Sequence, residues 1–383
     1  MHPAHISRFY QRWASAGEGR EAMADALSRS PASALDLQAL LAAQTDPGAP
    51  LPRALRRLRN LLLAVIIRRD LGGQADLSEV LEAMTRFADF AVRTLLAALS
   101  AELAQRHGVP IGETSRRPQE MIVLAMGKHG GGELNVSSDI DLIFVYPENG
   151  ETAPARPDQH PLSNQEFFTR LGKKLVTGLS AVDEDGFVFR VDMALRPNGG
   201  SGPLVVSLRM LEEYMIVQGS EWERYAWIKA RAVTGVAEDV AALDAVVRPF
   251  VFRRYLDFGV IDAIRNIHAQ IRTQVERLER LHPDRSDNVK LGRGGIREIE
   301  FLVQAFQLIR GGRDASLRER STRGMLRVAA EKGLLDEPTA RRLLDAYTFL
   351  RSVEHRLQYL DDAQTHALPT DEADRAAVAR MMG

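Results

Sequence analysis

Cysteine is absent from this 383-residue sequence, which excludes disulfide bonds and thiolate metal sites and is typical of proteins in the reducing cytosol. Long apolar runs are also absent. The longest strictly apolar run, residues 61–67, is far shorter than the roughly 20 residues that a membrane-spanning helix needs. The first residues, MHPAHISRFYQRW, lack the apolar stretch of a signal peptide. We therefore expect a cytoplasmic protein with no membrane partner.

An excess of charge of either sign is absent as well. The 50 basic residues are balanced by 51 acidic ones, so the chain as a whole is not attracted to nucleic acid. Four arginines precede the longest apolar run, without interleaved aromatic residues for base stacking, and we interpret them as the polar face of a buried helix. They are Arg53, Arg56, Arg57 and Arg59. The nine histidines form no H-x-x-x-H pair, so no zinc site is predicted.

Helical periodicity dominates both ends of the chain. In the first 110 residues it is clearest over residues 77–99, where apolar side chains recur every three or four positions. Gly108 is expected to stop this helix. From about residue 207 helices are predicted again, over residues 207–218, 221–232, 262–281, 296–309 and 338–360. The pattern continues to the last residues, so we expect a fragment of a longer protein.

The middle of the chain changes period. Residues 121–125 and 139–146 are short apolar runs typical of buried strands, and residues 187–193 alternate like a third strand. Ser163 is expected to cap an intervening helix, with Glu166 completing a capping box. We predict an α+β fold that is helical for most of its length. Its expected parts are an N-terminal helical region at 1–112, an αβ core at 113–206 and a C-terminal helical region at 207–383.

The segment MIVLAMGKHGGGELNVSSDIDLIFVY, residues 121–146, combines a glycine-rich loop with two aspartates. Asp139 and Asp141 are two residues apart on a predicted strand, so both carboxylates point to the same face. Like charges this close repel unless a cation lies between them, and Mg²⁺ prefers such oxygen ligands. Glycines allow backbone N–H groups to approach a phosphate; here they are Gly127, Gly130 and Gly131. The pattern predicts a phosphate and metal site, and the alternative is a solvated Asp-x-Asp at a strand end.

Two carboxylates hold a metal poorly, so we expect a third. Asp192 is the best candidate because of the superfamily resemblance described below, which places its third acid on a strand shortly after a helix. It lies on the predicted strand 187–193, on the same face as Arg190. The alternative is that Asp192 forms only a structural salt bridge with Arg190 or Arg196. With three carboxylates, two Mg²⁺ ions can bind about 3.5–4 Å apart and stabilise the attacking and leaving oxygens of a phosphoryl displacement.

The spacing from Gly127 to Asp139 and Asp141 resembles the signature of the polymerase-β nucleotidyltransferase superfamily. The wording MGKHGGGELNVSSDIDLIF is similar, nearly residue for residue, to the glutamine synthetase adenylyltransferase/adenylyl-removing enzyme family. Chains of that family carry two such domains, and SSDIDLIF resembles the N-terminal, deadenylylating one. Lys128 departs from the broad superfamily, in which glycine or serine is usual at that position, so its role is inferred from the narrower family alone.

This resemblance implies a polymerase-β-like core between two helical blocks, with Asp139, Asp141 and Asp192 as catalytic acids that bind two Mg²⁺ ions, or Mn²⁺ in their place. It implies that inorganic phosphate attacks the AMP on a tyrosine of adenylylated glutamine synthetase and releases ADP, which regulates nitrogen metabolism. It also implies the uridylylated PII signal protein as a partner. Two alternatives stay open: adenylyl transfer from ATP to the same tyrosine, and a catalytically silent module that binds nucleotide or PII.

The phosphate and the AMP group are both anions, so such a site needs cations besides the metals. Lys128, Arg190 and Arg196 are close enough in sequence to serve, and each has a structural alternative. Ser137 and Ser138 are expected either to donate to a phosphate oxygen or to cap the entry to the strand.

Two later segments carry weaker signals. Residues 220–233 contain Trp222, Tyr225 and Lys229, and we interpret the aromatic residues as core rather than as a base-stacking site, with Lys229 able to reach a phosphate. Residues 290–301, KLGRGGIREIEF, have a glycine-rich turn before a helix but lack the P-loop pattern. We interpret them as a tight turn with structural arginines, with contact to the active-site face left open.

Overall fold

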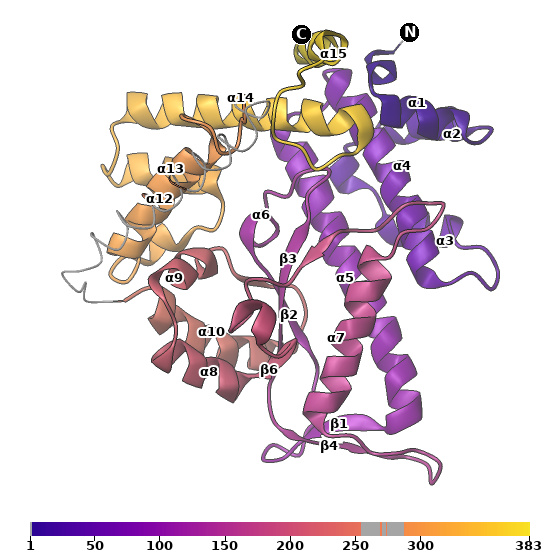
Figure 1. The fold of residues 1–383 in the computed structure, drawn as a ribbon, viewed down its shortest axis with the longest axis vertical. Coiled ribbons are helices and arrows are strands. Elements are labelled where there is room, and N and C mark those ends of the chain that lie inside the picture. The colour runs from indigo at the N-terminus through magenta and orange to yellow at the C-terminus, as the bar shows by residue number, and fades with distance from the viewer. Residues whose placement is uncertain (1, 254–268, 270–272, 274–286) are drawn as a thin grey trace.

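The computed structural model describes residues 2–253, 269, 273 and 287–383, and its chain termini lie close to the same end of the molecule (Figure 1). The fold is mostly helical with small mixed sheets, as predicted. The first helical block packs two long helices against shorter ones. Its helices are α1 (Arg8–Ser15), α2 (Arg20–Leu27), α3 (Leu37–Ala43), α4 (Leu51–Leu71) and α5 (Leu77–His107).

The predicted helix at 77–99 is confirmed as α5, which continues to His107. The Asp76 side chain accepts the Glu79 N–H at 2.9 Å and so caps its start. Gly108 follows the last residue with a φ of 86°, which confirms it as the stop. The apolar stripe of α5 is buried against α4, α7 (Asn164–Ser180) and the sheet, so burial of this one face holds the long helix in place.

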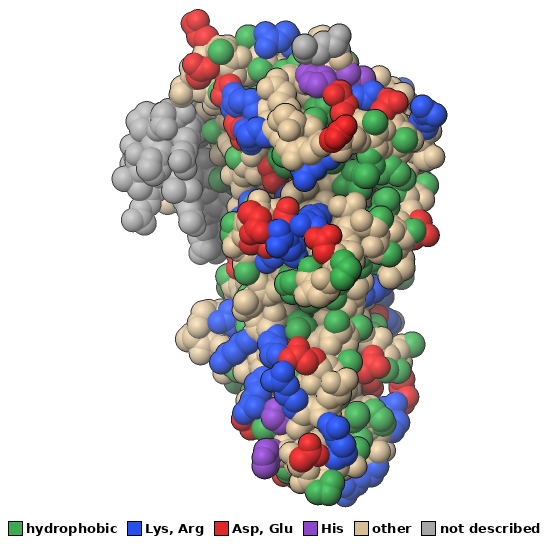
Figure 2. Space-filling view, turned by 90° about the vertical axis from the view of Figure 1, so that its right-hand side faces the viewer, with side chains coloured by type: hydrophobic (Ala, Val, Ile, Leu, Met, Phe, Trp, Pro, Cys, Tyr) green, Lys and Arg blue, Asp and Glu red, His purple; other side chains and the backbone are tan. Residues whose placement is uncertain are grey.

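The arginines of α4 are held within the fold, as predicted. Arg56 and Arg59 are buried, and they pair with Asp183 and Asp362, respectively, at 2.6 Å. The other two, Arg53 and Arg57, both pair with Asp185 at 3.0 Å. On the face of the molecule seen in Figure 2, acidic side chains lie among the basic ones instead of leaving a continuous basic surface. These arginines therefore serve structure.

A five-stranded mixed sheet lies at the centre. Its strands are β2 (Ile122–Ala125), β3 (Ile140–Tyr146), β5 (Val191–Asp192), β6 (Val205–Ser207) and β7 (Arg231–Ala232). β2 runs antiparallel to both β7 and β3. The other edge of β3 pairs in parallel with β5 at its start and with β6 at its end. A separate antiparallel pair, β1 (Val109–Gly112) with β4 (Gly150–Ala153), lies at the far end of α5 and α7 (Figure 1).

The two faces of β3 contact different helices, because successive side chains point to opposite sides of a strand. Leu142 and Phe144 pack into the core formed with α4, α5 and α7 (Asn164–Ser180). Ile143 and Val145 pack into a second core with three later helices, α8 (Leu208–Val217), α9 (Glu221–Trp227) and α10 (Ala237–Val251). Asp141 shares the face of Ile143 and Val145, so this alternation directs its carboxylate to the side of the later helices.

The later helical block follows β6. Its helices are α8 (Leu208–Val217), α9 (Glu221–Trp227), α10 (Ala237–Val251), α12 (Ile296–Arg310), α13 (Thr322–Glu331), α14 (Glu337–Asp361) and α15 (Glu372–Met382). The predicted helices at 207–218, 296–309 and 338–360 are confirmed to within one or two residues. The helix predicted at 262–281 lies outside the described residues. No helix in the described part of the chain is long and apolar enough to cross a bilayer.

Three local predictions were wrong. The helix expected over 221–232 ends at Trp227, and residues 231–232 instead join the sheet as β7. The strand expected over 187–193 is only β5, because the N–H groups of Val188 and Phe189 donate to the Leu179 carbonyl at the end of α7. Ser163 does cap α7, but the carboxylate of Glu166 bonds to Arg170 instead of returning to the cap.

Candidate active site

The glycine-rich loop follows β2 and begins with the single helical turn α6 (Gly127–Gly130). Gly127 has a φ of +54°, and a Cβ at this position would lie 2.7 Å from Oδ2 of Asp141. Any side chain would strain the backbone and crowd the carboxylate. Gly127 is therefore required for the loop to pass close to Asp141.

The next glycines are explained by packing. A Cβ on Gly130 would lie 1.9 Å from the carbonyl oxygen of Lys229, and one on Gly131 would lie 3.1 Å from that of Arg320. Both glycines thus let the loop lie against backbone from distant segments. Only Gly127 of the three predicted glycines lines the cavity described below, so phosphate binding by Gly130 and Gly131 stays a prediction.

The predicted acids lie at the start of β3 and on its neighbour β5. Asp141 is the direct partner of Asp192 in the parallel register of the two strands. Burial, followed by the negative charges of Asp139 and Asp192, raises the pKa of Asp141 to about 7. The negative charges of Asp139 and Asp192 therefore both act on the carboxylate of Asp141. That the three acids share one metal site stays a prediction.

The carboxylates of Asp139 and Asp141 have the chemistry that a hard divalent cation prefers: oxygen donors, partly buried, whose mutual repulsion a cation would relieve. One carboxylate oxygen of Asp192 already has a hydrogen-bond partner, because its Oδ1 accepts the N–H of Ala194 at 2.7 Å. Among the described residues, no group of three acidic or histidine side chains is already gathered tightly enough to hold an ion. The pair fits a metal, whereas the role of Asp192 stays a prediction.

The alternative role of Asp192 was a structural salt bridge with Arg190 or Arg196. In the described part of the chain, Asp192 forms no salt bridge with either of these arginines. The guanidinium of Arg196 donates to the carbonyls of Met193 at 2.7 Å and Gly200 at 3.2 Å and closes the turn between them. Arg190 donates to Ser137 Oγ at 3.2 Å.

Asp139 and Asp141 open into a cavity of about 490 Å³. Gly127, Lys128 and Ser138 also line it, and their binding of phosphate stays a prediction. Ser137, Arg190 and Arg196 are not brought to it. Ser137 is buried and its Oγ donates to the carbonyl of Asp362 at 2.9 Å. These three residues fix the loop and its surroundings rather than face the cavity.

Aromatic and basic residues from the later helices complete the cavity wall. Trp222 lines it with 48% of its surface exposed, and Tyr225 lies beside it. The interpretation of this segment as core is therefore wrong for Trp222 and correct for Trp227, which is buried. Arg297, interpreted as structural, also lines the cavity, together with Lys290. The glycine-rich turn of residues 290–301 was the signal for them.

Two lysines in the cavity already have carboxylate partners. Lys128 Nζ lies 2.9 and 3.0 Å from the carboxylate oxygens of the fully buried Glu354. Burial lowers the pKa of Lys128 to about 8, although Glu354 opposes this shift. Lys229 Nζ lies 3.2 Å from Glu300 Oε1 and 3.1 Å from Thr322 Oγ1. Each of these lysines therefore links a cavity wall to a helix of the later block.

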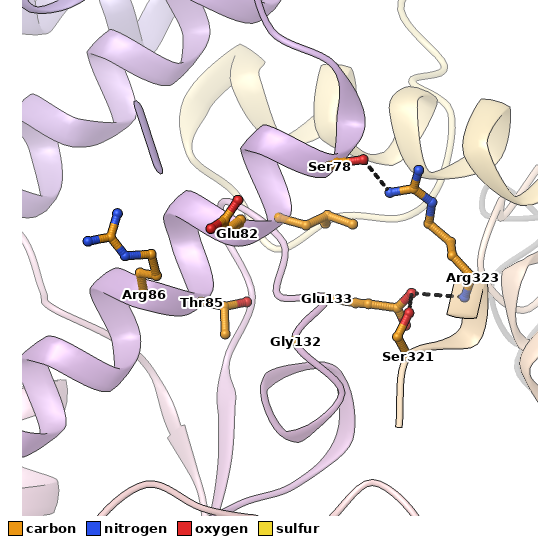
Figure 3. Close-up of a pocket in the computed structure, with 9 residues that line it drawn as sticks. Ser78, Glu82, Thr85, Arg86, Gly132, Glu133, Ser321 and Arg323 are labelled. Carbon is orange, nitrogen blue, oxygen red and sulfur yellow. Dashed lines mark hydrogen bonds between the residues drawn. The ribbon is translucent and has the colours of Figure 1, made fainter. Parts of the chain in front are cut away.

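The far side of the glycine loop is anchored as well (Figure 3). Glu133 is buried, and its carboxylate accepts the N–H groups of Thr322 at 3.0 Å and Arg323 at 3.2 Å at the start of α13. This places a negative charge at the positive end of the helix. Arg323 in turn donates to Ser78 on α5 at 2.8 Å. The loop that precedes the aspartates is thus held by both helical blocks.

Comparison with known proteins identifies the family to which this chain belongs. Residues 14–246, more than half of the chain, match the model of the family described as "Glutamate-ammonia ligase adenylyltransferase". The chain belongs to the glutamate-ammonia ligase adenylyltransferase family. Residues 265–383 match a second model, described as "GlnD PII-uridylyltransferase". The family assignment agrees with the resemblance of the glycine loop and confirms a nucleotidyltransferase-type domain in a mostly helical fold.

Relatives of this adenylyltransferase family are named "Bifunctional glutamine synthetase adenylyltransferase/adenylyl-removing enzyme". The protein from Ralstonia nicotianae is 53% identical over 99% of this chain and 42% of its own length. Those from Burkholderia mallei and Aromatoleum aromaticum are 53% and 51% identical over 97% and 100% of this chain, and over 41% and 39% of their own lengths. The chain therefore spans about two fifths of the length of these relatives.

Proposed function

We propose that this chain is the deadenylylating part of a bifunctional enzyme and removes AMP from a tyrosine of adenylylated glutamine synthetase by phosphorolysis. The single observation that carries the proposal is a cavity in which Asp139 and Asp141 face cationic side chains. The family assignment and the relatives' names support the substrate. The motif SSDIDLIF supports the direction, because it resembles the deadenylylating half.

In the proposed reaction an oxygen of inorganic phosphate attacks the phosphorus of the AMP group. The bond from that phosphorus to the tyrosine oxygen breaks, the new P–O–P linkage makes ADP, and the tyrosine leaves as a phenolate that is then protonated by water. Divalent cations bound at Asp139 and Asp141 would neutralise charge on the attacking and leaving oxygens. A phenolate of pKa about 10 is a moderate leaving group, so no general acid from the chain is required.

The side chains of this chain bind and position the reactants. Gly127 leaves the space beside Asp141 open, because any larger residue would enter it. Trp222 and Tyr225 offer aromatic surface to the nucleotide, and the cations of the later block attract the phosphates. The uridylylated PII protein is proposed as the partner that regulates the reaction, in the same cytoplasmic setting.

The test is to incubate the chain with Mg²⁺, inorganic phosphate and adenylylated glutamine synthetase. We expect ADP to form in proportion to the AMP removed, and only when phosphate is present. Free AMP without ADP would indicate hydrolysis instead. Modification of unadenylylated synthetase with ATP, without ADP formation from the adenylylated form, would assign the chain to the opposite direction. No reaction in either assay, with nucleotide still bound, would leave only a binding module.

Asp192→Ala is expected to raise the Mg²⁺ concentration needed for half-maximal activity about tenfold or more, because a metal ligand is lost. Added Mn²⁺ should restore part of the activity. The double variant Asp192→Ala with Arg190→Ala should show no recovery, since no ion pair joins these residues in the described structure and the ligand is still missing. Recovery in the double variant would instead mean that Asp192 only neutralises Arg190.

A further inference from the structure

We propose that Lys290 and Arg297 form a binding site for inorganic phosphate, and after the reaction for the terminal phosphoryl group of ADP. The inference rests on the proposed phosphorolysis and adds the place where its nucleophile binds. Both side chains line the same cavity as Asp139 and Asp141. They come from a segment about 150 residues further along the chain, Lys290 from the turn before α12 and Arg297 from the first turn of α12.

The cations of the cavity differ in what neutralises them. Lys128 and Lys229 are each paired with a buried or half-buried carboxylate, as described above. Within the described residues, Lys290 and Arg297 have no hydrogen-bond or ion-pair partner for their side chains. Two cationic side chains without a direct ion-pair partner can bind an anion in a partly enclosed cavity, although the carboxylates of Asp139, Asp141 and Glu300 line the same cavity. The planar guanidinium can bind a phosphate through two parallel hydrogen bonds.

The turn that contains Lys290 and leads into α12, where Arg297 lies, is held by hydrogen bonds to its own backbone. The N–H of Arg297 donates to the Lys290 carbonyl, and that of Ile296 donates to the Val289 carbonyl, both at 3.0 Å. The Asn288 side chain accepts the N–H groups of Lys290 and Leu291 at 3.0 and 2.9 Å. These amides are therefore not free to bind an anion, and recognition falls to the two side chains.

The position of the pair suits a nucleophile that must approach the metal-binding acids. The positive charges of Lys290 and Arg297 oppose the burial that raises the pKa of Asp141. After burial and Arg351, the charge of Lys290 also helps to lower the pKa of Lys128 on the glycine loop. An oxyanion bound between Lys290 and Lys128 would relieve the repulsion between these two cations. The bound oxyanion would then lie beside the carboxylates of Asp139 and Asp141.

The experiment compares the binding of ADP and AMP, because only ADP carries the phosphoryl group that the pair would hold. Calorimetry in the presence of Mg²⁺ gives both affinities without turnover. In Lys290→Met and Arg297→Met we expect ADP to bind about 10–100-fold more weakly, as for a lost charged hydrogen bond, and AMP to bind within about twofold of the parent. In the phosphorolysis assay the KM for phosphate should rise by a similar factor, with little change in the KM for the modified synthetase.

Arg293→Met is the matched control. Arg293 lies on the same turn and carries the same charge, but it is exposed and outside the cavity. It should leave both affinities and the KM for phosphate unchanged. Arg297→Lys keeps the charge without the planar fork, and we expect an intermediate loss for ADP. It also serves if Arg297→Met does not fold, as judged by its melting curve.

The proposal fails if Lys290→Met and Arg297→Met weaken ADP and AMP equally, or weaken neither. It also fails if Arg293→Met has the same effect, since general charge would then explain the result. Failure of the phosphorolysis proposal looks different: the parent chain would form no ADP from modified synthetase, while its preference for ADP over AMP would still depend on Lys290 and Arg297.

Discussion

Asp139→Asn and Asp141→Asn should each reduce ADP formation at least about 1,000-fold while leaving the melting temperature equal or higher. The activity loss follows from the proposed role of the two carboxylates, because a group that holds a catalytic metal contributes several kcal/mol to stabilisation of the transition state. The stability gain follows because burial and neighbouring acids disfavour a charged Asp141 when no metal is present. An asparagine of the same shape removes that repulsion.

Melting curves without metal and ADP formation with Mg²⁺ should be measured on the same protein samples. Asp158→Asn is a suitable control, because Asp158 lies on an exposed loop and its side chain is 75% exposed. It should change neither quantity. A large drop in melting temperature with activity retained in Asp139→Asn or Asp141→Asn would show that the pair stabilises the fold and does not take part in the reaction.

Glu354→Ala should lower the free energy of unfolding by about 3–5 kcal/mol, the usual cost of removing one partner from a buried ion pair. The carboxylate of Glu354 is fully buried, and Lys128 Nζ, Arg351 Nε and His366 Nδ1 lie 2.9, 3.1 and 2.8 Å from its oxygens. Without it, buried positive charges would lack compensation. Activity should fall as well, because Lys128 belongs to the glycine loop.

Denaturant unfolding of matched variants measures this effect. Glu337→Ala on the same helix removes an exposed pair with Arg341, whose side chains are about 70% exposed, and should cost less than about 1 kcal/mol. Combining Glu354→Ala with Lys128→Met should regain part of the lost stability, because one unpaired charge is then removed. A cost below 1 kcal/mol for Glu354→Ala alone would mean that water solvates Lys128 when its partner is absent.

Local motifs in the sequence were sufficient to predict which loop and strand residues would lie together in the candidate site. Gly127, Asp139 and Asp141 lie within 15 residues, and their relation follows from one turn and the alternation of one strand. The helices with strong periodicity were predicted for the same reason, since the apolar stripe of a helix such as α5 is a property of the segment itself.

The rest of the site depends on contacts between distant segments. Arg190 and Arg196 are close to the motif in sequence, but nearby Ser137 and backbone carbonyl groups take up their guanidinium groups, and no sequence pattern reports that. Lys290 and Arg297 are distant in sequence and reach the cavity because α12 packs beside α9 (Figure 1). The end of α9 was also missed, because pairing of residues 231–232 with β2 overrides a local helical preference.

The anchors of the glycine loop have a consequence for the order of synthesis. Lys128 pairs with Glu354 and Ser137 bonds to Asp362, so each contact spans more than 220 positions of the chain. At about 5–20 residues per second, a ribosome needs roughly 10–45 s to make that interval. During this time the sheet and first helices can form, but the loop beside the aspartates has neither anchor. A nascent chain should therefore acquire its activity late, only after α14 has emerged and docked.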